Sequence, residues 1–325
     1  TRGPAVTCRP TGVTFVARAS TQGMDILVAG GTGFIGRHLC AELHDRDHDV
    51  TALARDPDNE TLPGGVERSV GNVTAYDSLA GAFVGRDAAV NLVALSPLFE
   101  PGGGNEMHDR VHRQGTANCV EAAETAGVDR FVQMSALGAD AEGSTHYVRA
   151  KGRAEEHVRE SALDWTIFRP SVVFGDGGQF ISFTRTLTPP GVAPLPGGGR
   201  TRFQPIHVED LVVMLADAIE DDAHVGETYD IGGPSTLTLA DVARLVREAR
   251  GETVRVVPVP MALAGVGMTI GGLLPGVPFG LDQYRSLQLD NTTDDNDIDA
   301  FGFETADLTT LPTYLGVSDR QAGVV

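Results

Sequence analysis

The chain has 325 residues, and its 44 acidic side chains against 25 basic ones give a formal net charge of −19. Because a net negative field repels phosphate backbones, we expect no nucleic-acid partner. With 41% hydrophobic residues, the composition indicates a folded protein rather than a disordered one. The three cysteines, at positions 8, 40 and 119, form no CxxC pair, which argues against a disulfide framework or a metal site and favours a reducing compartment.

The charged residues are unevenly chosen, because Lys151 is the only lysine and Asp outnumbers Glu. An Asp-rich, Lys-poor surface is typical of a halophilic protein, since high salt screens the self-repulsion that would loosen the fold. The alternative is an ordinary acidic protein from a G+C-rich genome. We expect a cytoplasmic location, with peripheral association at the inner face of a membrane as a variant.

Residues 1–23 differ from the rest, because they carry three arginines and no acidic residue. The longest apolar stretch there, around residues 13–17, is shorter than the roughly 7–15 residues of a signal-peptide core and contains Thr14. We predict an unstructured leader that lies outside the fold.

From residue 25 onward, short apolar runs alternate with helical periods. We predict strands at 26–29, 50–54, 88–94, 130–134 and 165–168, separated by helices at 35–43, around 79–83, about 107–126 and about 145–161. This alternation predicts right-handed crossovers and a parallel sheet covered on both faces. The expected fold class is therefore α/β, a Rossmann-type doubly wound parallel sheet.

The regular pattern weakens after residue 175, in a stretch rich in Pro and Gly at 176–199. Later patterns predict helices at 208–219 and 239–250 and strands at 227–231 and 254–257. We therefore divide the chain into a dinucleotide-binding domain at 24–175, with returning elements at about 203–231, and a smaller C-terminal substrate lobe. The lobe consists of residues 176–202 and 232–325.

Residues 256–281 contain no charged side chain, which raises the question of a membrane segment. Prolines at 258, 260, 275 and 278 confine any helix to about 261–274, and at roughly 1.5 Å per residue such a helix is too short to span a bilayer. We interpret the segment as a lid or wall for an apolar substrate, with a docking surface as the alternative.

The first strand runs directly into the sequence GGTGFIG, in which Gly30, Gly33 and Gly36 are spaced three apart and an amphipathic helix follows. In this position the glycines permit a tight turn, close approach of backbone to phosphate, and close packing of helix on sheet, while free N–H groups at the helix start stabilise a pyrophosphate. The pattern predicts a dinucleotide site.

The second strand ends at Ala54, where an NAD enzyme usually places an acidic residue against the ribose 2′-hydroxyl. Arg55 follows, and a guanidinium there can pair with a 2′-phosphate. Ala54 followed by Arg55 therefore favours NADP as the cofactor, with NAD as the alternative. The alternative role for Arg55 is that of a solvated loop residue that pairs with Asp56.

The lone lysine lies four residues after a tyrosine, so Tyr147 and Lys151 share one face of the predicted helix. A compact ammonium can bond cofactor ribose hydroxyls and lower the pKa of a neighbouring phenol, whereas a planar guanidinium is larger and oriented differently. Tyr147 can then exchange a proton with a substrate oxygen while hydride moves to or from nicotinamide. An ordinary surface pair is the alternative.

Six segments together resemble the extended and atypical short-chain dehydrogenase/reductase superfamily, also described as NAD-dependent epimerase/dehydratase. They are GGTGFIG, QGTANCVEAA, YVRAK, FRPSVVFG, QPIHVEDL and YDIGGPSTLTLADV, and the likeness spans residues 24 to 316. Within the superfamily, the sequence is most similar to the branch that contains the nucleotide-binding accessory subunit of respiratory complex I.

The resemblance implies the positions that hold the cofactor, from its pyrophosphate through its adenosine to its nicotinamide. Asn72 departs from the family, which usually has Asp there. The implied cofactor-binding residues are Gly30, Thr32, Gly33, Phe34, Ile35, Gly36, Arg55, Asn72, Val73, Ala94, Leu95, Tyr147, Lys151, Pro170 and Val173.

The catalytic residues implied are Tyr147, Lys151 and a hydroxyl after the 130–134 strand, which aligns with Ser135 by one count and with Ala136 by another. Loss of that hydroxyl would deprive a substrate carbonyl of one donor. We therefore predict an NADP(H)-preferring oxidoreductase for an apolar carbonyl or quinone-like small molecule. The first alternative is a non-catalytic accessory or sensor subunit associated with a respiratory complex, and the second is a nucleotide-sugar epimerase or dehydratase.

Overall fold

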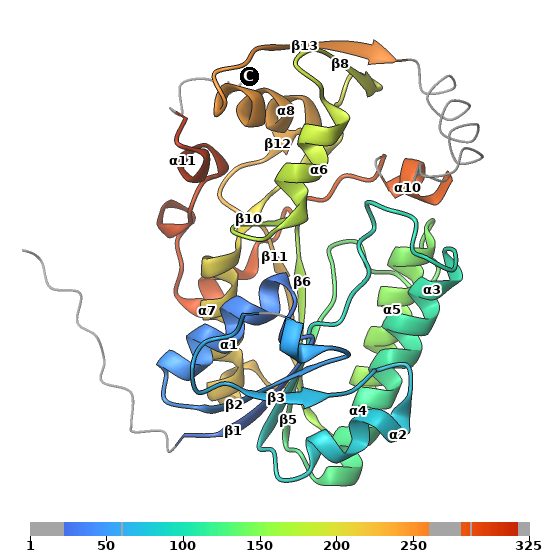
Figure 1. The fold of residues 1–325 in the computed structure, drawn as a ribbon, viewed down its shortest axis with the longest axis vertical. Coiled ribbons are helices and arrows are strands. Elements are labelled where there is room, and N and C mark those ends of the chain that lie inside the picture. The colour runs from blue at the N-terminus through green and yellow to red at the C-terminus, as the bar shows by residue number, and fades with distance from the viewer. Residues whose placement is uncertain (1–22, 60, 260–280, 287, 318–325) are drawn as a thin grey trace, which may run out of the picture.

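The computed structural model describes residues 23–59, 61–259, 281–286 and 288–317. The predicted leader and most of the uncharged 256–281 segment lie outside these residues. The described chain folds into a large sheet with helices on both faces and a smaller lobe above one edge of the sheet (Figure 1).

Seven parallel strands form the sheet, in the order β11-β6-β5-β4-β1-β2-β3. Their bounds are β1 Asp25–Ala29, β2 Asp49–Ala54, β3 Glu67–Val70, β4 Ala88–Asn91, β5 Arg130–Met134, β6 Asp164–Pro170 and β11 Thr228–Ile231. Because β4 pairs with β1 on the side opposite β2, successive connections run in opposite directions from this point. This is the doubly wound Rossmann arrangement that the sequence predicts.

Alternate residues of β1 enter different cores, because successive side chains of a strand point to opposite faces of a sheet. Ile26 and Val28 pack with helices α1 (Phe34–Asp45) and α7 (Val208–Glu220). Leu27 packs on the other face. The helices there are α2 (Tyr76–Leu79), α4 (Gly115–Ala126) and α5 (His146–Arg159), seen beside the sheet in Figure 1.

A long helical segment precedes α4 without a break. It comprises α3 (Glu106–His108) and a π-helical stretch at Asp109–Gln114, so the helix predicted at about 107–126 is present with a wider turn near its start. A π-helical turn in an α-helix commonly marks a functional site. Short 3₁₀ helices lie elsewhere in the chain, at Pro57–Asn59, Ala80–Phe83, Asp222–His224, Asp297–Phe301 and Thr305–Asp307.

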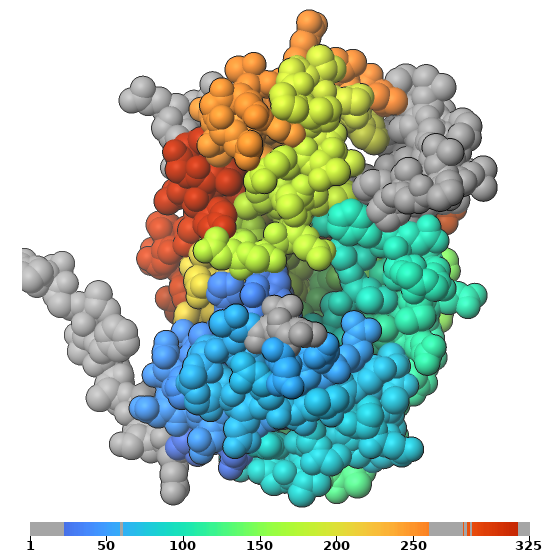
Figure 2. All heavy atoms as spheres, viewed as in Figure 1, coloured from blue at the N-terminus to red at the C-terminus, as the bar shows by residue number. Residues whose placement is uncertain are grey.

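The smaller lobe has its own core, formed largely by Phe180, Leu195, Phe203 and the buried face of α8 (Leu239–Glu248). Strands β8 (Gly191–Pro196) and β13 (Val254–Val259) pair in parallel at its top. In Figure 2 this yellow-green and orange lobe sits above the blue and cyan body. The other helices and strands outside the seven-stranded sheet are α6 Gln179–Leu187, β7 Val173–Phe174, β9 Arg202–Phe203, β10 Ile206–His207, β12 Leu237–Thr238, α10 Leu281–Ser286 and α11 Leu311–Leu315.

Three details differ from the sequence-based expectations. The strand expected at 88–94 ends at Asn91, whose side-chain oxygen accepts a hydrogen bond from the backbone N–H of Val93 at 3.2 Å and turns the chain out of the sheet. The 176–199 stretch contains α6 and β8. The edge strand β3 has no counterpart among the predicted strands.

Candidate functional site

A cavity of about 1490 Å³ lies at the carboxyl edge of the sheet, beneath the lobe. Its wall includes the segments that follow β1, β2, β3, β4, β5 and β6, and the lobe contributes Phe180 and Phe203. In open parallel sheets, ligands bind outside the carboxyl ends of the strands at the point where the strand order reverses. The cavity occupies that place, next to β1 and β4.

Every residue that the sequence predicts for the cofactor or for catalysis contributes to the wall of this one cavity. The fold brings them together from six different strand ends and from helix α5. They are Gly30, Thr32, Gly33, Phe34, Ile35, Gly36, Arg55, Asn72, Val73, Ala94, Leu95, Ser135, Tyr147, Lys151, Pro170 and Val173.

The glycine turn after β1 is shaped for close approach of a ligand to the backbone. Gly30 has φ +83°, a conformation that side chains of L-residues rarely adopt. A Cβ added to Gly36 would lie 2.2 Å from the carbonyl oxygen of Gly30. Helix α1 begins after Gly33 with no side-chain cap, so its first N–H groups face the cavity side as donors for an anion. The turn therefore fits a dinucleotide pyrophosphate.

The arginines Arg55 and Arg37 line the cavity, and Asp56 lies beside the first of them. Arg55 is exposed directly after Ala54 at the end of β2. Arg37, in the first turn of α1, lines the same cavity and was missed in the sequence reading, although its place one residue after Gly36 was a usable signal. Asn72 uses its side-chain oxygen to accept from the N–H and hydroxyl of Thr74, at 3.1 and 3.0 Å, and so closes the turn after β3.

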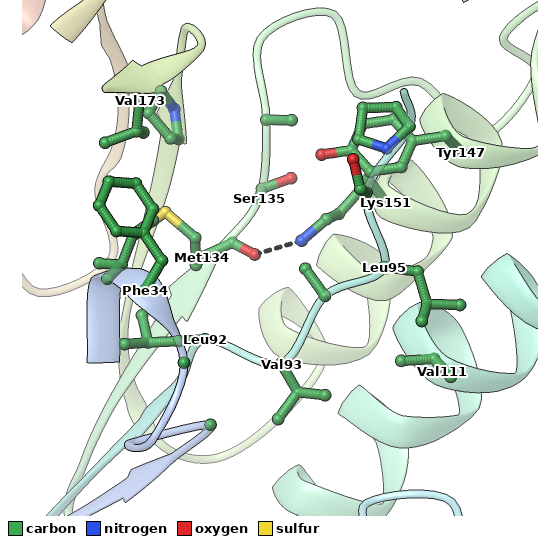
Figure 3. A pocket seen from close by; sticks show the side chains of 18 of the residues that line it. Phe34, Leu92, Val93, Leu95, Val111, Met134, Ser135, Tyr147, Lys151 and Val173 are labelled. Atoms are coloured by element: carbon green, nitrogen blue, oxygen red, sulfur yellow. Dashed lines mark hydrogen bonds between the residues drawn. The ribbon is translucent and has the colours of Figure 1, made fainter. Parts of the chain in front are cut away.

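Tyr147 and Lys151 project from the same side of α5, as their spacing predicts (Figure 3). The ammonium of Lys151 is only 2% exposed and donates a hydrogen bond to the carbonyl oxygen of Met134 at 2.7 Å. Burial lowers the pKa of Lys151 to about 8, against an opposing effect of the Glu155 carboxylate. Burial also raises the pKa of the Tyr147 phenol, which therefore stays protonated.

Ser135 follows β5 and contributes to the cavity wall, but its hydroxyl donates its proton to Glu155. Glu155 is 1% exposed and also accepts from Arg169, at 2.6 and 2.8 Å, and from Arg159 at 2.9 Å. The Ser135 proton is therefore committed to a buried carboxylate. A second hydroxyl, that of Ser144, is exposed in the same cavity three residues before Tyr147 and was missed in the sequence reading.

Two findings concern other kinds of site. In the described ranges, no group of three or more His, Cys, Asp or Glu side chains is arranged to hold a metal ion. Within the same residues, none of the helices has both the length and the apolar character needed to cross a membrane.

The comparisons with known proteins agree with the geometry. Residues 30–188 match the family described as NAD(P)H-binding. The chain is 28% identical to the Arabidopsis thaliana NADH dehydrogenase 1 alpha subcomplex subunit 9, over 90% of this chain and 75% of that protein. It is also 28% identical to the NAD(P)H azoreductase of Xenophilus azovorans, over 81% of this chain and 86% of that protein.

Among solved structures, a nucleoside-diphosphate-sugar epimerase from Staphylococcus aureus superposes with a TM-score of 0.70 at 18% identity, over 90% of this chain and 99% of that one. The likeness shows the fold. The chain thus contains an NAD(P)-binding domain at residues 30–188, and its fold is the one seen in that epimerase.

The hydrogen bond from Ser135 to Glu155 predicts a stability effect. We expect Ser135→Ala to lower the free energy of unfolding by about 1–3 kcal/mol, because a buried carboxylate loses a donor. Ser144→Ala is the matched control, since its exposed hydroxyl has no hydrogen bond to the described residues. Urea unfolding of both variants measures the difference, and equal stabilities would show that the Ser135 bond contributes nothing.

The lowered pKa of Lys151 predicts how cofactor binding depends on pH. The ammonium is charged below about pH 8 and neutral above it, so the affinity for NADPH should fall as the pH rises through 8. Fluorescence titration of NADPH between pH 6 and 10 measures this. Lys151→Gln should bind more weakly at pH 6 and lose the dependence around pH 8, and a fall of the same size in that variant would assign it to another group.

Proposed function

We propose that the chain is an NADP(H)-preferring oxidoreductase that reduces an apolar small molecule with a carbonyl, quinone or azo group. The observation that carries the proposal is the placing of Tyr147 and Lys151 in the wall of the cavity that also holds the glycine turn. A proton donor and a buried cation beside a dinucleotide site are what hydride transfer to a polar double bond requires.

A bound NADPH supplies the hydride, and the protein's own residues do the rest. Tyr147 donates its phenolic proton to the substrate atom that gains negative charge. Lys151 stabilises the resulting phenolate as a nearby positive charge in a poorly solvated place. Leu95 and Val111 line the same side of the cavity as Tyr147 and exclude water there (Figure 3).

The apolar wall supports an apolar substrate. Met107, Leu98, Phe180 and Phe203 add to it, and the rings of the last two lie 5.7 Å apart in the lobe. The division of the chain into a cofactor domain and a substrate lobe is part of the proposal. The similarity to an NAD(P)H azoreductase supports a reductase with an azo acceptor, and these apolar side chains favour it over the polar sugar nucleotide of an epimerase.

The second candidate is a non-catalytic, NADPH-binding accessory subunit of a respiratory complex. It is favoured by the commitment of the Ser135 proton to Glu155 and by the similarity to the NADH dehydrogenase subunit. Peripheral association with a membrane complex belongs to this candidate. A halophilic cytoplasm, proposed from the acidic composition, is compatible with both candidates.

Replacing Arg55 tests the cofactor preference. We expect Arg55→Ala to weaken NADPH binding by about 10- to 100-fold, because a charge-assisted hydrogen bond to the 2′-phosphate is lost, and to leave NADH binding unchanged. The control is Arg86→Ala, whose guanidinium pairs with Asp25 away from the cavity. Isothermal titration with both cofactors gives the ratio. Equal losses for NADPH and NADH would remove the 2′-phosphate assignment.

Replacing Tyr147 tests catalysis. With NADPH and a panel of quinones, azo dyes and apolar carbonyls, Tyr147→Phe should reduce kcat by about 10²- to 10⁴-fold with little change in NADPH affinity, because only the proton donor is lost. Tyr76→Phe, outside the cavity, serves as the control. Tight NADPH binding without turnover on any acceptor would favour the accessory subunit instead.

A further inference from the structure

Two buried histidines pack against the ring of Tyr147. His108 ends α3 and His112 lies one turn later in the π-helical stretch, and they are 0% and 1% exposed. Their ring centroids lie 5.7 and 5.3 Å from that of Tyr147 and 5.4 Å from each other, all edge to face. The three rings form one cluster, which we call the histidine–tyrosine cluster.

Burying ring nitrogens without hydrogen-bond partners costs free energy of folding. The Nε2 atom of His112 accepts a hydrogen bond from the backbone N–H of Leu95 at 3.0 Å, so the neutral ring carries its proton on Nδ1. That Nδ1, and both ring nitrogens of His108, have no hydrogen-bond partner among the described residues. Leucine or phenylalanine would fill such a place without the cost of unpaired polar atoms. A function of these nitrogens during turnover would account for the stability that the unpaired atoms cost.

The cluster faces charged groups from two directions. Lys151 of α5 lowers the pKa of both histidines, although burial is the larger cause. Asp282 of α10 raises the pKa of His108 and is itself 5% exposed. The Asp282 carboxylate accepts from the backbone N–H of His146 at 3.0 Å and lies 3.3 Å from its Nδ1, and the His146 side chain is 45% exposed. Asp282 thus acts on His108 and is bonded to His146, whose side chain reaches solvent.

We propose that His108, positioned by His112, forms with Asp282 and His146 the path by which a proton from solvent replaces the one that Tyr147 gives to substrate. This inference rests on the proposed oxidoreductase function. After Tyr147 donates its proton, the neutral ring of His108 passes its one ring proton to the phenolate and accepts another at its other nitrogen from the Asp282 and His146 side. His112 does not relay, because its Nε2 is held by the N–H of Leu95. The net transfer is one proton from solvent to the phenol. It leaves His108 neutral but in its other tautomer, which a rotation of the ring restores before the next turnover.

The neutral state of the pair suits this role. Burial lowers the pKa of His108 to about 4, so at neutral pH the ring does not hold a second proton between turnovers. A protonated histidine beside Lys151 would also repel its ammonium. His108 therefore passes protons on and does not store them.

His108→Phe tests the path in the full chain, because it keeps an aromatic ring against Tyr147 and removes both nitrogens. With NADPH and a quinone or azo acceptor at low buffer concentration, we expect steady-state turnover to fall about tenfold or more, while hydride transfer in the first turnover stays unchanged. His108→Ala should fall likewise and be accelerated by added imidazole. The control, His157→Phe, changes a partly exposed histidine of α5 outside the cavity.

If both His108 variants turn over at the wild-type rate, or if imidazole gives no acceleration, the path is wrong even though the oxidoreductase function stands.

A second measurement, nitrogen NMR of the histidine rings, needs no turnover. Asp282→Asn should lower the pKa of His108 further, and Tyr147→Phe should shift ring nitrogens of the pair. Unchanged ring signals in both variants would overturn the path, whereas absence of turnover with every acceptor would overturn the proposed function.

Discussion

The strand order of the sheet is the constraint on which the site depends. Because β4 joins β1 on the side opposite β2, the connections diverge and leave open space at the carboxyl ends of these two strands. The glycine turn fills that edge with backbone instead of side chains, since a Cβ at Gly36 would meet the Gly30 carbonyl. A helix start and six strand ends then converge on one cavity.

The second physical feature of this cavity is that the charged groups beside it are poorly solvated. Lys151 is buried beside Tyr147, and Glu155 lies one turn further along α5 with two arginines around it. In such surroundings each charge acts strongly on its neighbours, because little water screens it. The serine hydroxyl that the family resemblance assigns to substrate is drawn into this network, whereas the hydroxyls of Tyr147 and Ser144 stay in the cavity wall.

Elements with strong internal patterns were predictable. The strand at 130–134 was predicted with its observed bounds, and the helices α1 and α7 nearly so, because apolar periodicity and burial coincide in them. The edge strand β3 was missed because its residues are mostly exposed and it exists through pairing with β2. Strand β8 and helix α6 were missed because their Pro- and Gly-rich surroundings hide them, while pairing with β13 and packing against α8 stabilise them.

The sequence by itself determined the fold class, the glycine turn, the Arg55 position and the Tyr147–Lys151 spacing, because each depends on residues close together in the chain. Only the tertiary structure decided that the Ser135 proton goes to Glu155, that Ser144 is exposed beside Tyr147, and that His108 and His112 enclose its ring. These facts depend on contacts between separate elements, whose direction and burial are set by packing and not by spacing along the chain.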